Sequence, residues 1–285
     1  MAVAPRIGVK RGRILGHVAV WILLTALGVL WMGPFLWMVS SSFKTLSEIY
    51  TYPPLWIPAE LQFYNYVSAW TKIPFGRFFL NSVIVTSSVV IGTLLTSSMG
   101  GYSFSRLRFP GRDPIFIAYI ATMMVPFTVL MIPLYVIMRS FGFINTLQSL
   151  IVPSLFTAWG TFLMRQFMMT LPKELEESAK VDGAGYFMIY WRIILPLCKP
   201  VLATLAIFTF LGSWNNFLWP LIMINTVDNR TVPLGIAMFQ SFRAMRTPWH
   251  LVMAASTFTI IPILIAFILG QKYYVRGIQI SGLKG

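Results

Sequence analysis

Long apolar runs dominate the chain, and short polar segments separate them. A helix needs roughly 20 apolar residues to cross a bilayer. Six runs are long enough to be predicted as spans: His17–Val39, Phe78–Gly101, Ile115–Ile137, Leu150–Phe167, Val201–Ile224 and Leu251–Gly270. The pattern therefore predicts an all-α integral membrane protein with six transmembrane helices and with both termini on one side.

Charged residues are scarce and lie between the apolar runs. They make up 11% of the 285 residues, against about 25% in a typical soluble domain. Fifteen of the 22 Lys and Arg residues fall on the side of the two termini. The positive-inside rule therefore places both termini in the cytoplasm. The net charge of +14 is interpreted as topological anchoring, and no nucleic-acid partner is expected.

The same pattern divides the chain into three parts. Residues 1–16 are predicted to be a cytoplasmic N-tail, residues 17–271 a six-span domain, and residues 272–285 a cytoplasmic C-tail. The first apolar run is too long for the hydrophobic part of a signal peptide, so we expect it to remain as an uncleaved span.

The acidic residues exclude several kinds of chemistry. All eight lie outside the six runs, whereas ion-coupled and proton-coupled transporters usually carry ionisable groups within the membrane. The chain also lacks a G-x-x-x-x-G-K-[ST] phosphate-binding loop. Cys198 is the single cysteine, and His17 and His250 lie near opposite ends of the chain, so no metal site is expected. Active transport would therefore take its energy from a separate chain, and no catalytic residues are predicted here.

Residues 171–196, between the fourth and fifth runs, form the most informative polar segment. Four of the eight acids gather in it: Glu174, Glu176, Glu177 and Asp182. Acids favour a helix start, Glu176 and Lys180 have the spacing of a helical ion pair, and Gly183 suits a left-handed helix stop. The pattern predicts a short cytoplasmic helix, a turn and a second short helix. An ordinary solvated loop is the alternative.

One motif in this segment resembles a known signature. Glu177-Ser178-Ala179 is followed after three residues by Gly183, and after nine more by Ile193-Ile194-Leu195-Pro196. This resembles the "EAA" signature of permease subunits of binding-protein-dependent ABC importers, with Ser178 in place of the middle alanine. Further features resemble the carbohydrate branch, which includes maltose-type permeases: Asp182-Gly183-Ala184, Trp214-Asn215-Asn216-Phe217 and the final Lys284-Gly285.

The resemblance implies a role and a set of partners. The chain would be a non-catalytic, multi-pass permease subunit in the inner membrane of a bacterial or archaeal cell, surrounded by lipid. Its partners would be two ATPase subunits that bind ATP and Mg, an extracytoplasmic solute-binding protein and a second permease. Family habit favours a heterodimer of permeases, and a homodimer stays open.

The resemblance also implies site residues. The ATPase-coupling surface would consist of Glu177, Ser178, Ala179, Asp182 and Gly183. The substrate path is a weaker inference and would use Trp214, Asn215, Asn216 and Trp219, because aromatic faces and amides bind sugars. Interhelical packing is the alternative role for these four residues. A stand-alone secondary transporter or channel is the alternative function, a membrane enzyme or scaffold is a third, and the solute stays open.

Overall fold

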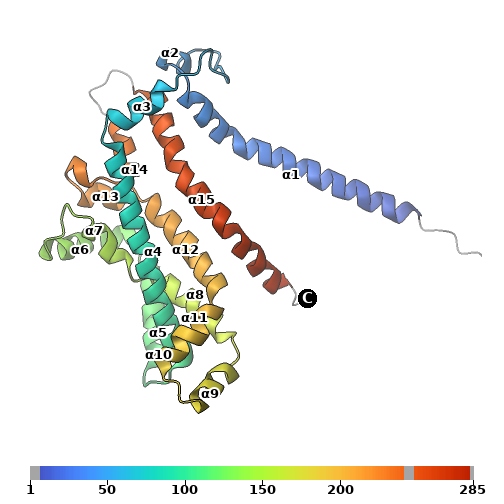
Figure 1. Cartoon of the computed structure of the whole chain (residues 1–285), viewed down its shortest axis with the longest axis vertical. Coiled ribbons are helices and arrows are strands. Elements are labelled where there is room, and N and C mark those ends of the chain that lie inside the picture. Colours follow the sequence, from blue (N-terminus) through green and yellow to red (C-terminus); the bar gives the residue numbers. More distant parts are fainter. Residues whose placement is uncertain (1–6, 241–246, 283–285) are drawn as a thin grey trace, which may run out of the picture. The chain divides into compact units, whose positions relative to one another are not determined.

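The computed structural model describes residues 7–240 and 247–282, and it is helical with connecting loops over these residues (Figure 1). The α-helices are α1 Ile7–Ser42, α2 Leu46–Ile49, α3 Tyr64–Thr71, α4 Phe75–Arg106, α5 Arg112–Ala121, α6 Phe127–Ser140, α7 Gln148–Ile151, α8 Ala158–Met169, α9 Glu174–Val181, α10 Tyr186–Ile189, α11 Leu195–Leu197, α12 Lys199–Trp214, α13 Leu218–Met223, α14 Val232–Ile236 and α15 Trp249–Gly282. Short 3₁₀ turns and one π-helical turn at Tyr190–Ile194 connect some of them. Parts of the predicted tails, residues 1–6 and 283–285, lie outside the described residues.

The chain forms two compact units. Among the described residues, the first unit comprises 7–69 and 247–258, and the second comprises 70–240 and 259–282. The long α1 belongs to the first unit, and its side chains from His17 to Leu30 are exposed. Both sites described below lie in the second unit.

The first unit contains a short folded segment after α1. Thr45 and Glu48 form a capping box at the start of α2, and backbone hydrogen bonds from Thr45 and Ala59 lower the pKa of the Glu48 carboxyl. Lys44 is fully buried: its Nζ donates to the Leu55 carbonyl at 2.5 Å. Burial lowers the pKa of this ammonium group.

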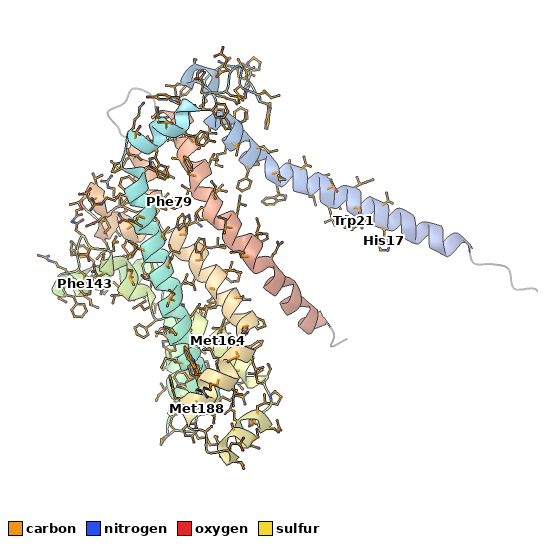
Figure 2. The ribbon with its side chains drawn as sticks, in the orientation of Figure 1. His17, Trp21, Phe79, Phe143, Met164 and Met188 are labelled. Carbon is orange, nitrogen blue, oxygen red and sulfur yellow. The ribbon has the colours of Figure 1, made fainter. Side chains whose placement is uncertain are left out.

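α4 is the centre of the second unit and packs against α8 and α12 (Figure 1). Small residues permit this approach. A Cβ atom on Gly101 would lie 2.6 Å from Met164 Cβ, and one on Gly92 would lie 2.3 Å from Leu155 Cδ2. Met164 is fully buried (Figure 2). Glycine at these positions therefore lets α4 pack closely against the neighbouring segment.

Three described helical segments are long and apolar enough to cross a membrane: Gly16–Ser42, Phe75–Arg106 and Trp249–Gln271. Two further pairs of helices qualify if each bent pair is one span. The pair α5–α6 is bent by 103°, and the pair formed by Tyr186–Leu197 and α12 is bent by 78°. The structure thus shows three spans, or up to five, by length and composition.

The predicted fourth span, Leu150–Phe167, is not one continuous helix. It is divided between α7, a 3₁₀ turn at Val152–Ser154 and the 12-residue α8. Twelve residues rise about 18 Å, which is less than the roughly 30 Å hydrocarbon core. Pro153 lies in the break, and Pro126 lies at the bend between α5 and α6. Proline has no backbone N–H to donate, so breaks are expected at these positions.

Candidate functional site

The predicted helix, turn and helix are present in residues 171–196. α9 carries three glutamates in its first turn and Lys180 in its last, as the helix dipole favours. Gly183 has φ +80°, and its N–H donates to the Lys180 carbonyl at 3.0 Å. The Ala184 N–H donates to the Ala179 carbonyl at 2.9 Å. These two bonds form a Schellman motif, which needs a left-handed residue and explains the glycine.

α9 has an exposed face and a buried face. Glu177, Ser178 and Asp182 are exposed, and Val181 is 88% exposed. Glu176 and Ala179 are buried; Ala179 packs in a core cluster with Met164 and Met168 of α8. Of the residues predicted to couple to an ATPase, Glu177, Ser178, Asp182 and Gly183 are therefore accessible, whereas Ala179 holds the helix against the core.

A buried ion pair fixes α9 to the end of α4. Arg106 Nε lies 3.2 Å from Glu176 Oε1, and the two side chains are only 4% and 7% exposed. The same guanidinium donates through Nη2 to the carbonyls of Met168 and of Leu171, the second at 2.7 Å. One cation thus joins α9, the end of α4 and the end of α8. Arg106 is paired and also hydrogen-bonded through Nη2, as a buried cation requires. Its Nε and Glu176 Oε1 meet as an ion pair and not as a hydrogen bond.

The sequence missed this contact. The predicted Glu176–Lys180 pair is wrong, because Glu176 points to Arg106 and the Lys180 ammonium lies 5.1 Å from the centre of the Tyr186 ring. A spacing of four residues shows only that two side chains share a helix face. Nothing local in the sequence indicates that a cation 70 positions away reaches the same carboxylate.

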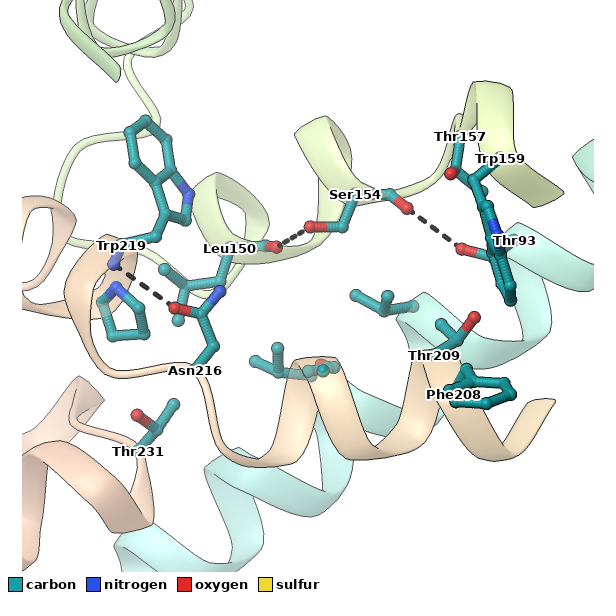
Figure 3. Close-up of a pocket in the computed structure, with 15 residues that line it drawn as sticks. Thr93, Leu150, Ser154, Thr157, Trp159, Phe208, Thr209, Asn216, Trp219 and Thr231 are labelled. Carbon is teal, nitrogen blue, oxygen red and sulfur yellow. Dashed lines mark hydrogen bonds between the residues drawn. The ribbon is translucent and has the colours of Figure 1, made fainter. Parts of the chain in front are cut away.

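A cavity of about 410 Å³ lies in the second unit, among α4, α7–α8, α12 and α13. Figure 3 shows Trp219 and Asn216 at one end and Trp159, Thr93 and Phe208 at the other. The Trp159 and Phe208 rings meet edge to face, 5.6 Å between centroids.

The cavity has polar groups but no charges among its lining residues. Hydroxyl groups come from Thr93, Ser154, Thr157, Thr209, Ser213 and Thr231. Thr93 Oγ1 donates to the Ser154 carbonyl at 3.0 Å, whereas Thr231 Oγ1 is buried without a hydrogen-bond partner. Aromatic faces beside hydroxyl and amide groups suit a neutral, polar solute better than an ion.

The structure separates the four residues predicted for the substrate path. Asn216 and Trp219 line the cavity, and Trp214 and Asn215 do not. Trp214 is buried, donates to the Thr259 carbonyl at 3.1 Å and stacks on Phe210.

Trp219 also has a structural bond, from its Nε1 to the Ser149 carbonyl at 2.9 Å. The cavity residues Trp159, Thr209 and Thr157 were missed because their positions share no sequence motif.

Among the side chains that the structure describes, no group of three or more His, Cys, Asp or Glu residues could hold a metal ion. Cys198 is buried in the core beneath α9 and α10.

Comparison with known proteins identifies relatives along most of the chain. The family described as "Binding-protein-dependent transport system inner membrane component" matches residues 88–280. The arabinooligosaccharides transport system permease protein AraQ of Halalkalibacterium halodurans is 35% identical over 259 residues, 88% of this chain and 91% of that protein. The sn-glycerol-3-phosphate transport system permease protein UgpE of Yersinia pestis is 34% identical over 238 residues, 81% of this chain and 85% of that protein.

Two solved structures share the fold. One is a bacterial ABC transporter involved in the import of the acidic polysaccharide alginate, with a TM-score of 0.82 and 22% identity over 96% of this chain and 100% of that chain. The other is a bacterial alginate ABC transporter in complex with an alginate pentasaccharide-bound periplasmic protein, with a TM-score of 0.65 and 14% identity over 92% and 94%. The chain therefore belongs to the family of binding-protein-dependent transport system inner membrane components and is a multi-pass membrane protein.

Proposed function

We propose that this chain is a permease subunit of an ATP-driven ABC importer and forms half of the translocation path for a sugar or a related solute. Its relatives carry names that refer to arabinooligosaccharides and sn-glycerol-3-phosphate, and the similar fold belongs to an importer of alginate. The uncharged, aromatic and hydroxyl-rich cavity supports a neutral sugar over an ion.

Coupling to the ATPase is assigned to the exposed face of α9. The observation that carries it is the contrast between the accessible Glu177, Ser178 and Asp182 and the buried Arg106–Glu176 pair beneath them. A push on the exposed face would reach α4 and α8 through a paired charge that is costly to break. In this proposal Ala179 and Gly183 shape the surface, and neither needs to contact the ATPase.

The proposed partners are those that the family resemblance implies. We assign two ATPase subunits, which bind ATP and Mg, a second permease in a heterodimer, and an extracytoplasmic solute-binding protein. One alginate transporter was solved with its periplasmic protein, which supports the last of these. This chain then performs no catalysis of its own.

The proposed topology keeps six crossings and both termini in the cytoplasm. Each bent pair counts as one crossing, and the broken segment from α7 through α8 supplies the sixth. Residues 1–16 and 272–285 are the tails, and residues 17–271 are the permease domain. Discontinuous helices at membrane depth are tolerated where they are buried in protein or line a cavity, and α7 and its 3₁₀ turn border the cavity.

The substrate path is assigned to the cavity. Asn216 and Trp219 are retained from the sequence, with Trp159 and Thr209 added because they line the same space. Trp214 and Asn215 stay in the proposal as residues that position the end of α12, since the Asn215 amide donates to the Leu211 carbonyl at 3.0 Å.

The test is crosslinking from position 178 in the purified assembly. Cys198 is fully buried, so Ser178→Cys adds the accessible thiol of this chain, and a bifunctional thiol reagent should join it to a Walker-motif ATPase. Ser140→Cys, at the end of α6, is the exposed control and should not crosslink to that partner. Uptake by the chain alone, with no ATPase captured through position 178, would favour a stand-alone secondary transporter.

A further inference from the structure

A basic pocket lies between the end of α4 and α9. It has a volume of about 350 Å³ and is lined by five cations: Arg106, Arg108, Arg112, Lys173 and Lys180. Two carboxylates, Glu176 and Glu177, line the same pocket. The pocket therefore has an excess of positive charge, and it is separate from the uncharged cavity described above.

Several of these cations have no strong acidic partner. Arg106 is paired with Glu176, and Arg112 Nε donates to Asp113 at 2.9 Å. Arg108 and Lys173 are exposed, and Lys180 lies over an aromatic ring. When the paired Arg106 and Arg112 are left out, the pocket keeps three cations, Arg108, Lys173 and Lys180, and one carboxylate, that of Glu177. A site of this composition attracts an anion.

An apolar groove of about 180 Å³ adjoins the basic pocket. Met99, Tyr102, Leu107, Phe187 and Tyr190 line it, and Tyr186 lines both the groove and the pocket. Met99 is 51% exposed and Phe187 is 69% exposed. The groove thus continues the basic pocket along the side of α4 with a surface that suits an acyl chain.

A polar atom without a partner lies in the groove. Tyr102 is 95% buried, being 5% exposed, yet its hydroxyl has no hydrogen-bond partner. Tyr102 precedes Arg106 by one helical turn on α4, so the two share a helix face. A buried hydroxyl normally has a partner, and an oxygen of a bound ligand would supply one here.

The depth of the site matches a lipid. From Met99 to Arg106 the chain takes seven helical steps and rises about 10 Å along α4. Beyond the roughly 30 Å hydrocarbon core, the headgroup regions bring the bilayer to about 40–45 Å. An acyl chain beside Met99 would therefore lie in the hydrocarbon core, and a phosphate beside Arg108 would lie in the headgroup region. The Lys and Arg distribution places this end of α4 on the cytoplasmic side.

We propose that the basic pocket and the apolar groove together bind one anionic phospholipid. Its phosphate contacts Arg108, Lys173 and Lys180, and one acyl chain lies along the groove between α4 and α10. Basic pockets at the cytoplasmic end of membrane helices recognise such headgroups. A carboxylate from an ATPase would match the charge but would leave the apolar groove unfilled, so the lipid accounts for both halves of the site.

The test uses the complete transporter in phosphatidylcholine nanodiscs that contain spin-labelled phosphatidylglycerol. Arg108→Gln with Lys173→Gln should weaken retention of the labelled lipid about 25-fold, since each basic residue near an anionic membrane surface contributes about fivefold. Lys72→Gln with Arg139→Gln removes the same charge elsewhere and should leave retention unchanged; both control residues are exposed. Equal retention in the two double variants would overturn the proposal.

Two further measurements identify the ligand. Short-chain phosphatidylglycerol should displace the labelled lipid at concentrations where inorganic phosphate and glycerol phosphate do not. Met99→Gln should bring the concentration of phosphatidylglycerol needed for displacement closer to that of the soluble phosphates. Equal competition by inorganic phosphate would instead mean a site for soluble anions. Labelled lipid that binds only after the ATPase is removed would mean that the partner occupies the pocket. Neither result depends on crosslinking at position 178, so this inference and the proposed function can fail separately.

Discussion

The α9 segment and the cavity use polar residues in opposite ways. α9 exposes charged and hydroxyl groups within a few consecutive positions, and one buried ion pair holds them in place. The cavity encloses uncharged groups that come from helices far apart in the sequence, beside aromatic rings. An exposed charged face suits contact with another protein of complementary charge, and a cavity lined by uncharged polar and aromatic groups suits a neutral solute.

The two regions also differ in what a single substitution should do. The α9 surface is held in place by the buried Arg106–Glu176 pair, so variants of that pair should lower the stability of the protein strongly. Variants of the exposed residues should change only contact with the partner. In the cavity one residue can both support the fold and face the solute, as Trp219 does. The following variants separate these roles.

The largest effect is expected from the buried ion pair. Arg106→Gln leaves the Glu176 carboxylate buried without its cation, which should destabilise the protein by about 3–5 kcal/mol. The control is Asp113→Asn, which removes the carboxylate that Arg112 and Arg165 share; this carboxylate is 60% exposed, so its loss should change stability far less. Thermal unfolding of the detergent-purified protein measures both. Arg106→Met combined with Glu176→Met should recover much of the loss, and no recovery would contradict a role for the charge pair.

Variants of two tryptophans should separate an effect on stability from an effect on transport. Trp219 is 2% exposed and hydrogen-bonded to Ser149, so Trp219→Ala should cost about 3–5 kcal/mol. Trp159 is 36% exposed and lines the same cavity, so Trp159→Ala should raise the KM for uptake and change the melting temperature little. Uptake assays in vesicles and thermal unfolding are the measurements. An unchanged KM in Trp159→Ala would remove the cavity from the substrate path.

The contact between α4 and α8 should tolerate no added methyl group. Gly101→Ala places a Cβ 2.6 Å from Met164 Cβ and 3.0 Å from the Arg165 backbone nitrogen, so overpacking should cost about 1–3 kcal/mol. Gly28→Ala is the matched control, because a Cβ there has no atom within 4 Å. Equal melting temperatures for the two variants would contradict the close packing of these helices.

The smallest effect on stability is expected in the turn after α9. Gly183→Asp introduces a side chain at φ +80°, at a cost of about 1–2 kcal/mol, and should uncouple ATP hydrolysis from uptake while the protein stays in the membrane. Gly185→Asp is the control in the same turn, since its φ of −73° suits any residue. Wild-type uptake by Gly183→Asp would count against α9 as the coupling element.

Local features of the α9 segment could be predicted from the sequence. The acids at the helix start, the stop at Gly183 and the second helix are all present, because each depends on neighbouring residues. The predicted partner of Glu176 was wrong, since the cation comes from α4. Of the four residues predicted for the substrate path, Asn216 and Trp219 line the cavity. Lining a shared space depends on helix packing, which no local motif records.

The sequence by itself determined that this is an all-helical membrane protein of the importer permease family, because long apolar runs and a contiguous motif carry those signals. It did not determine where the helices break. Proline marks possible breaks, yet Pro34 and Pro262 lie inside continuous helices while Pro153 lies in an interruption. Only the tertiary structure decided these outcomes, along with the Arg106–Glu176 pair and the cavity, because each depends on which distant helices pack together.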